Sequence, residues 1–122
     1  MNRTVLIVDD DLVNRKLARA LLEHLGWSVS ECENGQQALQ QAATDNFACV
    51  LLDLGLPDLS GWEVCQRLRA SHGNALRIIA YTAHMLEEDS AQMLQSGFDQ
   101  VLIKPVTLAS VSRFFADEPS NG

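Results

Sequence analysis

The chain has 122 residues, of which 47% are hydrophobic and 20% are charged, and these proportions are typical of one globular domain and exclude a disordered or fibrous protein. Its 16 acidic and 9 basic residues give a formal net charge of −7, which argues against nucleic acid as a partner, because phosphate backbones are bound by clustered Lys and Arg. The first apolar run, Val5–Val8, is too short for a signal peptide or a membrane span, so we expect a cytoplasmic domain without membrane contact.

Short apolar runs alternate with amphipathic stretches along the chain. The five runs predicted as strands are Thr4–Asp9, Trp27–Cys32, Phe47–Asp53, Leu76–Thr82 and Gln100–Ile103. The five stretches predicted as helices are Asp11–Leu25, Gly35–Thr44, Gly61–Ser71, Leu86–Ser96 and Leu108–Phe115. This alternation predicts an α/β fold, a doubly wound five-stranded parallel sheet with helices on both faces. We expect one domain over residues 1–116 and a flexible tail over 117–122.

The first predicted helix shows its spacing clearly. Its apolar face is predicted to comprise Leu17, Ala18, Leu21, Leu22 and Leu25. Three charged residues are expected to point away from that face: Arg15, Arg19 and Glu23. Gly26 and Gly97 are predicted to end the first and fourth helices.

Three cysteines, Cys32, Cys49 and Cys65, lie among apolar or helical neighbours. Their number is odd and they form no CxxC pair, which does not favour a disulfide framework. We expect them to be small buried hydrophobic residues of a protein in a reducing compartment.

Polar residues follow the predicted strands at their carboxyl ends, where ligands of an open parallel sheet bind. The first strand ends at the acidic run Asp9–Asp11, the third at Asp53 and the fourth at Thr82, while Lys104 follows the fifth. Three carboxylates meeting at one edge repel by about 4 kcal/mol per pair at 4 Å and an effective dielectric near 20. An oxygen-rich site of this kind suits Mg²⁺ or Mn²⁺.

These residue types together suit the handling of a phosphoryl group. A metal ion, the Lys104 ammonium and the Thr82 hydroxyl around one carboxylate can position and neutralise phosphoryl oxygens. Asp53 is then the nucleophile, forming an acyl phosphate. Each feature has a simpler alternative when taken alone, since an acidic run after a strand often caps a helix, and Asp11 is a candidate for that cap.

The sequence resembles the receiver domain of two-component response regulators and hybrid sensor kinases. The matching segments span nearly the whole chain, in order and at family spacing: Val5–Asp11, Val50–Pro57 with Ser60 and Gly61, Ile78–Ala83, Ser96–Asp99 and Lys104–Pro105. The resemblance implies that Asp53 is the phosphoacceptor, taking a phosphoryl group from a phosphohistidine on a histidine kinase or histidine phosphotransfer domain. It also implies that Asp9, Asp10, Asp53 and the backbone carbonyl of Gly55 bind Mg²⁺, with Asp10 a direct ligand and Asp9 acting partly through water.

The same resemblance implies roles for two further residues. Thr82 corresponds to the switch hydroxyl that turns toward the phosphoryl oxygens, and Lys104 to the lysine that pairs with them. The family also implies a cis Lys104–Pro105 bond, the strand order 2-1-3-4-5, and an output face made of the fourth helix, fifth strand and fifth helix. A phosphodonor is expected to dock at the first helix, where Leu12 and Val13 are apolar beside the site.

The sequence departs from the family pattern at Val101, where an aromatic residue often reports the state of the switch. Phe98 is a candidate to pack nearby, with a place in the core as the simpler alternative. By the same resemblance, His84 and Gly55 occupy positions that in this family influence how long the phosphoryl group persists. The simpler alternative for His84 is an exposed histidine of a loop. Features such as Asn14–Arg15 resemble receivers attached to hybrid kinases.

Two other functions compete with a phosphorylated receiver. A Mg²⁺-dependent phosphatase with an aspartate nucleophile usually has a second Asp two residues later, where this chain has Gly55. A pseudo-receiver, or a flavodoxin-like binding module, would normally lack Asp53, Lys104 or the acid pair, all of which are present. We therefore expect no turnover beyond slow self-dephosphorylation. Since few residues follow Phe115, we expect output through protein contacts.

Overall fold

The computed structural model describes residues 2–83, 92–93 and 95–115. Within these residues one five-stranded sheet has the order β2-β1-β3-β4-β5, and its neighbouring strands are all parallel. The strands are β1 (Thr4–Val8), β2 (Ser28–Cys32), β3 (Cys49–Asp53), β4 (Arg77–Thr82) and β5 (Gln100–Ile103). The predicted fold class and strand order are confirmed, and each predicted strand differs by at most two residues at either end.

The described residues contain four α-helices and one short 3-10 turn. They are α1 (Leu12–His24), α2 (Gly35–Thr44), α3 (Gly61–His72), α5 (Leu108–Phe115) and the 3-10 turn η1 (Gly73–Ala75). The predicted helix Leu86–Ser96 and the predicted tail 117–122 lie largely or wholly outside the described residues. In the part of the chain that the structure describes, no helix is long and apolar enough to cross a membrane.

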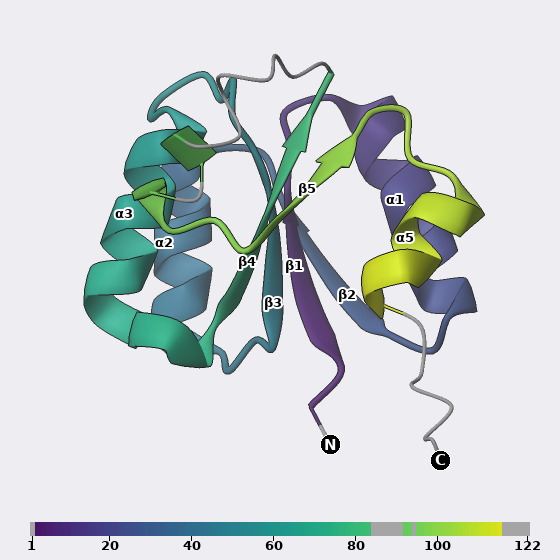
Figure 1. Ribbon diagram of the computed structural model, residues 1–122, viewed down its shortest axis with the longest axis horizontal. Coiled ribbons are helices and arrows are strands. Elements are labelled where there is room, and N and C mark those ends of the chain that lie inside the picture. Colours follow the sequence, from purple (N-terminus) through teal and green to yellow (C-terminus); the bar gives the residue numbers. More distant parts are fainter. Residues whose placement is uncertain (1, 84–91, 94, 116–122) are drawn as a thin grey trace.

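Helices cover both faces of the sheet, with α1 and α5 on one side and α2 and α3 on the other (Figure 1). Successive residues of a strand point to opposite faces of the sheet and belong to two separate hydrophobic cores. In β1, Leu6 and Val8 pack toward α2 and α3, whereas Val5 and Ile7 pack toward α1 and α5. All five residues of β3 are buried, which explains why this central strand is continuously apolar until its last residue. The carboxyl ends of the strands lie at the top of Figure 1.

Helix α1 begins at the acidic run that follows β1. The Asp11 side chain accepts hydrogen bonds from the backbone N–H groups of Val13 at 2.9 Å and Asn14 at 3.2 Å, so it is the N-cap. Gly26 and Gly97 have φ angles of 93° and 107°, in the left-handed region that favours glycine, as their positions after helices predict.

One prediction about α1 is wrong. Arg15 is only 8% exposed, whereas Leu17, placed by its spacing on the apolar face, is 38% exposed. The Arg15 guanidinium lies inward because it finds two acceptors there, the Glu31 carboxylate and the Asp9 carbonyl oxygen. Buried charge is tolerated when it is paired and hydrogen-bonded in this way.

The three cysteines are free and buried, as predicted. Burial raises the pKa of the Cys32 and Cys49 thiols to about 12 and that of Cys65 to about 11. These thiols therefore stay protonated and pack as small hydrophobic groups.

Candidate functional site

Three carboxylates meet at the carboxyl edge of the sheet. Asp53 is the last residue of β3, and Asp9 and Asp10 follow β1, which pairs with β3 through Val8 and Leu52. Asp9, Asp10 and Asp53 each offer one carboxylate oxygen, and these oxygens all lie within 4.8 Å of one another. The register of the parallel strands thus brings together residues far apart in sequence.

The Lys104 ammonium lies between two of these carboxylates. Its Nζ is 3.0 Å from Asp9 Oδ2 and 3.3 Å from Asp53 Oδ2, and its side chain is only 13% exposed. The same nitrogen lies 4.6 Å from the centre of the Tyr81 ring, which offers a further cation–π contact. Lys104 is thus held by three groups from three strands or strand ends.

The environment of Asp9 opposes its ionisation. Burial raises the pKa of this carboxyl, while a hydrogen bond from the Asp11 backbone and the nearby Lys104 ammonium oppose that increase. Asp9 Oδ1 accepts the Asp11 N–H at 2.9 Å. Its other oxygen, the buried Asp9 Oδ2, faces the Lys104 ammonium at 3.0 Å.

The residues at this edge fit a hard divalent cation. Three carboxylates face one ammonium, so the cluster holds more negative than positive charge when ionised. Asp10 is exposed and lies beside the buried Asp9, which leaves a route from solvent to the cluster. Carboxylate oxygens with access to water are the ligands that Mg²⁺ prefers.

Glycine at position 61 fixes the segment that follows Asp53. The Gly61 N–H donates to the Leu54 carbonyl oxygen at 2.9 Å, and a Cβ at Gly61 would collide with the Asp53 carbonyl oxygen and the Leu54 Cα. Next to Asp53 the Gly55 backbone is exposed, and its N–H donates to Asp53 Oδ1 at 3.2 Å. The β3–α3 loop therefore orients one oxygen of Asp53 and leaves the backbone of Gly55 accessible.

Strands β4 and β5 place Thr82 and Lys104 at the same edge. The Lys104 N–H donates to the Thr82 carbonyl oxygen at 2.7 Å, and Thr82 pairs with Ile103 across the two strands. The Lys104–Pro105 peptide bond is cis, as the family resemblance implied. Thr82 is half-buried at the end of β4.

Some residues that influence the site were not identified from the sequence. Arg15 Nη1 donates to the Asp9 carbonyl oxygen at 2.9 Å, and the Tyr81 hydroxyl donates to the Asn14 carbonyl oxygen at 3.1 Å. The sequence did hold an indication of the buried arginine, because Glu31 places a charge in a predicted strand and a charge there needs a partner. No comparable signal marked the Tyr81 contact.

The positions that depart from the family pattern are only partly described. Val101 is half-buried and packs against the core on the side of α2 and α3. Phe98 is buried in that core, with its ring 5.6 Å from the Trp62 ring in an edge-to-face arrangement, so its simpler predicted role as a core residue is confirmed. His84 lies outside the described residues.

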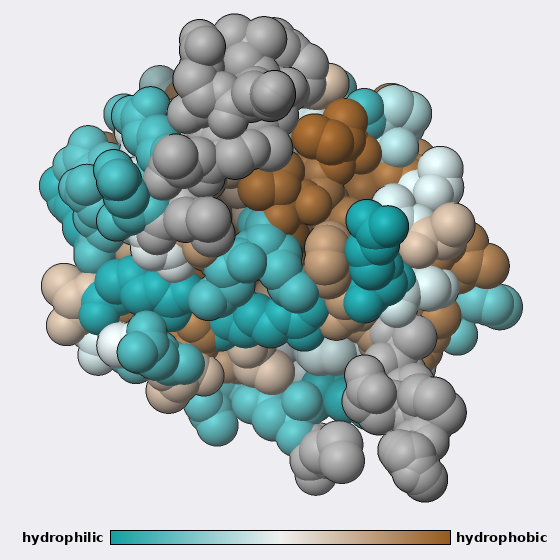
Figure 2. All heavy atoms as spheres, in the orientation of Figure 1, coloured by the Kyte–Doolittle hydropathy of each residue, from teal (hydrophilic) through white to brown (hydrophobic). Residues whose placement is uncertain are grey.

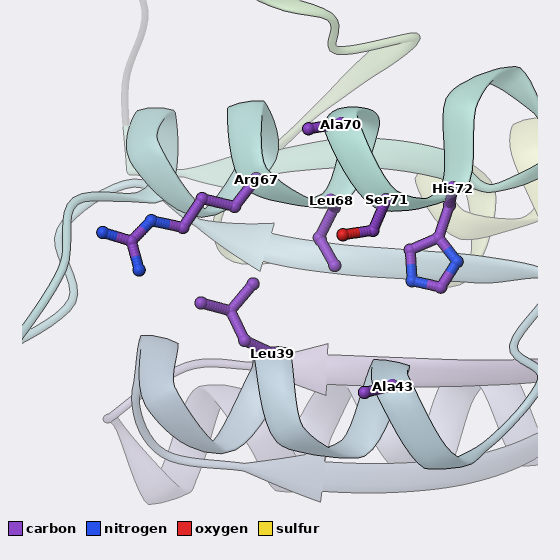
Figure 3. Close-up of a pocket in the computed structure, with 7 residues that line it drawn as sticks. All are labelled: Leu39, Ala43, Arg67, Leu68, Ala70, Ser71 and His72. Atoms are coloured by element: carbon purple, nitrogen blue, oxygen red, sulfur yellow. The ribbon is translucent and has the colours of Figure 1, made fainter.

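A groove of about 560 Å³ lies between α2 and α3, away from the carboxylates. Figure 3 shows Leu39 and Leu68 facing each other across it, with Arg67 and His72 toward its two ends. The remaining lining residues are Ala43, Ala70 and Ser71. None of the three clustered carboxylates lines this groove, so the chemistry of the donor groups, and not the volume of the groove, identifies the candidate site.

Comparison with known proteins assigns the family. The model of the response regulator receiver domain matches residues 5–113, and the chain belongs to this family. It is therefore a receiver domain of the kind found in two-component systems, with a CheY-like fold.

Relatives of two architectures share this domain. The chain is 36% identical over 107 residues to the sensor histidine kinase GacS of Pseudomonas protegens, covering 84% of this chain and 12% of GacS. It is 37% identical over 105 residues to the transcriptional regulatory protein SrrA of Staphylococcus aureus, covering 86% of this chain and 43% of SrrA. The chain thus spans less than half the length of either relative.

Solved structures agree with the fold. The receiver domain of the sensor histidine kinase PA1611 from Pseudomonas aeruginosa PAO1 is 32% identical with a TM-score of 0.82, covering 94% of this chain and 95% of that one. That structure holds a magnesium ion in its active site cleft. A receiver domain protein from Methanospirillum hungatei JF-1 is 26% identical with a TM-score of 0.83, covering 93% of this chain and 90% of that one.

Proposed function

We propose that Asp53 accepts a phosphoryl group from a phosphohistidine on a histidine kinase or histidine phosphotransfer domain. The observation that carries this proposal is the position of its carboxylate, with Oδ2 3.3 Å from Lys104 Nζ and Oδ1 held by the Gly55 N–H. An Asp53 oxygen forms the new bond to phosphorus while the phosphorus–nitrogen bond of the donor breaks, and the donor histidine keeps that bonding electron pair. A donor of this kind agrees with a cytoplasmic location.

The proposed cation ligands are the carboxylates of Asp9, Asp10 and Asp53 and the backbone carbonyl of Gly55. Mg²⁺, or Mn²⁺ in its place, would neutralise charge on the phosphoryl oxygens when bound. Asp10 is exposed, which suits a direct ligand, whereas the buried Asp9 is already engaged by Lys104 and the Asp11 N–H. The PA1611 receiver, which holds magnesium in its cleft, supports the same ion here.

Lys104 and Thr82 are the proposed switch pair. Phosphorylation replaces the single charge of Asp53 by close to two negative charges, which strengthens the attraction of the Lys104 ammonium for this site. Thr82 shares a backbone hydrogen bond with Lys104, so a hydroxyl turning toward the phosphoryl group acts on the same pair of strands. Preferential engagement of both residues in one arrangement shifts the population toward that arrangement.

The proposed output face includes β5 and α5, together with the predicted fourth helix. Ile103 at the end of β5 and Leu108 at the start of α5 are exposed hydrophobic residues. Figure 2 shows hydrophobic residues at the surface over the end of β5. A protein partner that covers this surface would sense changes at Thr82 and Lys104 directly, because these residues belong to the same strand ends.

A second surface is proposed for the phosphodonor. Leu12 and Val13 in the first turn of α1 are 56% and 74% exposed, directly after the acidic run. Apolar side chains of this size beside a charged site favour contact with another protein. A donor protein docked there would bring its phosphohistidine close to Asp53.

Slow self-dephosphorylation is the proposed limit of turnover. An aspartate-based phosphatase uses an acidic group two residues after its nucleophile, and here that place is Gly55, whose exposed backbone has open space where a side chain would begin. Because no side-chain acid stands at that position, the water that hydrolyses the acyl phosphate has no general acid–base partner there, and hydrolysis is slow.

Binding of beryllofluoride, a phosphoryl mimic, tests the function. In fluorine NMR spectra we expect resonances of bound beryllofluoride for the wild-type protein with Mg²⁺ and none for Asp53→Asn. The control variant Asp45→Asn, which neutralises an exposed carboxylate at the end of α2, should behave like wild type. Equal binding by wild type and Asp53→Asn would contradict the assignment of the phosphoacceptor.

A further inference from the structure

We infer that Arg15 is a positioning residue for the cation site, holding the main chain at Asp9 so that the adjacent carboxylates face the ion. This inference rests on the proposed function. Arg15 Nη1 donates to the Asp9 carbonyl oxygen at 2.9 Å in a buried hydrogen bond, and Nε donates to Glu31 Oε1 at 2.9 Å. The arginine therefore connects β2 to the turn that carries the acid pair.

The buried guanidinium is supported by an unusually well-paired glutamate. The Glu31 side chain is 9% exposed and also contacts Lys16 Nζ at 2.9 Å and Arg19 Nη1 at 2.7 Å. Burial alone would raise the pKa of Glu31, but hydrogen bonds from Arg19, Lys16 and Arg15 outweigh it and lower the pKa to about 2. Two other cations thus pair with Glu31, and what distinguishes Arg15 is its contact with Asp9.

The Asp9 carbonyl is a sensitive point for the geometry of the site. The Asp9 N–H donates to the Cys32 carbonyl oxygen at 3.2 Å, and its carboxylate accepts the Asp11 N–H at 2.9 Å. Its own carbonyl oxygen, which accepts from Arg15, belongs to the peptide group that joins Asp9 to Asp10. Fixing that peptide plane therefore sets the direction in which the exposed Asp10 side chain extends from the backbone.

Electrostatics and positioning predict opposite results when Arg15 is removed. Loss of a positive charge near a cation site should tighten binding of the cation, because one repulsive interaction disappears. Loss of a positioning contact should weaken it, and removal of such outer contacts typically costs about 10- to 100-fold in metal affinity. The direction of the change thus separates the two effects.

Arg19 provides a matched control for Arg15. Both arginines lie on α1 and pair with Glu31, and replacing either by Gln removes one positive charge. Arg19 has its second contact with Glu23, at 3.0 Å, and not with the acid pair. If the Glu31 cluster affects cation binding only by stabilising the fold, both replacements should weaken binding. If Arg15 positions Asp9, only Arg15→Gln should weaken it.

The test is titration of the full chain with Mn²⁺, with free ion followed by electron paramagnetic resonance and folding by circular dichroism without metal. We expect Arg15→Gln to weaken Mn²⁺ binding at least tenfold, and Arg19→Gln to leave it within twofold of wild type. Arg15→Lys keeps the positive charge but lacks the planar guanidinium that reaches both acceptors, so we expect it to weaken Mn²⁺ binding at least threefold. This variant serves as the test if Arg15→Gln does not fold.

The outcomes separate this inference from the proposed function. Unchanged or tighter Mn²⁺ binding by folded Arg15→Gln or Arg15→Lys would overturn the role of Arg15 while leaving the cation site in place. Equal weakening by Arg15→Gln and Arg19→Gln would also overturn it, since the effect would then belong to the Glu31 cluster. No Mn²⁺ binding by wild type would overturn the cation site and this inference together.

Discussion

Lys104 Nζ lies 3.3 Å from Asp53 Oδ2, at the end of a side chain that is 13% exposed. The same nitrogen lies 3.0 Å from Asp9 Oδ2. One ammonium shared by two carboxylates compensates only part of their charge, and Asp10 adds a third carboxylate. The pairing therefore orients Asp53 while leaving the cluster attractive to a divalent cation.

Replacing Lys104 by Gln separates cation binding from phosphoryl transfer. Removal of the ammonium relieves repulsion toward the ion, so Mg²⁺ affinity measured by calorimetry should stay the same or rise. Labelling by acetyl phosphate should fall by about 10- to 100-fold, because one fixed positive charge on the phosphoryl oxygens is lost. Loss of Mg²⁺ binding in Lys104→Gln would show that the lysine supports the acid pair structurally.

Replacing Asp10 by Ala should remove a ligand of the proposed cation site. We expect Mg²⁺ affinity to fall at least about tenfold, because ligand charge sets affinity at such sites. Asp10 is exposed, so the melting temperature of the metal-free protein should change little. An unchanged Mg²⁺ titration would remove Asp10 from the ligand set, and Asp45→Ala serves as the control for general loss of negative charge.

Replacing Gly61 by Ala should strain the loop that follows Asp53. The new methyl group would meet the Asp53 carbonyl oxygen and the Leu54 Cα, and overpacking of this kind costs about 1–3 kcal/mol. Urea denaturation measures the loss. Gly55→Ala is the matched control for stability, because nothing lies within 4 Å of a Cβ at Gly55. Equal stability of both variants would contradict the close approach at Gly61.

The cations around Glu31 predict a dependence of stability on pH. The pKa of Glu31 is about 2 in the folded protein against an ordinary value of 4.5, so its contribution to the free energy of unfolding is present above pH 4.5 and is lost as the pH falls toward 2. The shift corresponds to roughly 3 kcal/mol of stability. Urea denaturation between neutral pH and pH 3 should show a steeper loss for wild type than for Glu31→Gln. The same loss of stability with falling pH in wild type and Glu31→Gln would contradict a stabilising role of the cations around Glu31.

Most of the fold was predictable because it depends on patterns that are local in sequence. Continuous apolar runs mark buried strands such as β3, and Gly26 and Gly97 mark the ends of helices. The gathering of carboxylates was predictable for a related reason, since the carboxyl ends of parallel strands meet at one edge. For Asp11 the simpler alternative, a helix cap, was the correct one, because Asp11 caps α1 and is not one of the clustered carboxylates.

What the sequence did not reveal depends on pairing across the fold. Arg15 was expected to point away from the apolar face of α1, but it lies on the same buried face as Ala18 and Leu22. Its charge is accommodated there by two acceptors from other segments, the Glu31 carboxylate and the Asp9 carbonyl oxygen. The need for glycine at position 61 likewise depends on how closely α3 approaches the end of β3. In both cases the determining contact joins elements whose distance the local pattern does not encode.

Chemical mapping of the phosphorylated residue tests the role of Asp53. The protein is incubated with acetyl phosphate and Mg²⁺, the acyl phosphate is reduced with borohydride to an alcohol, and peptides are sequenced by mass spectrometry. We predict that residue 53 alone carries the reduced side chain and that Asp53→Asn yields none. Reduction mapped to Asp9, Asp10 or any other acidic residue of the wild-type protein would contradict the role assigned to Asp53.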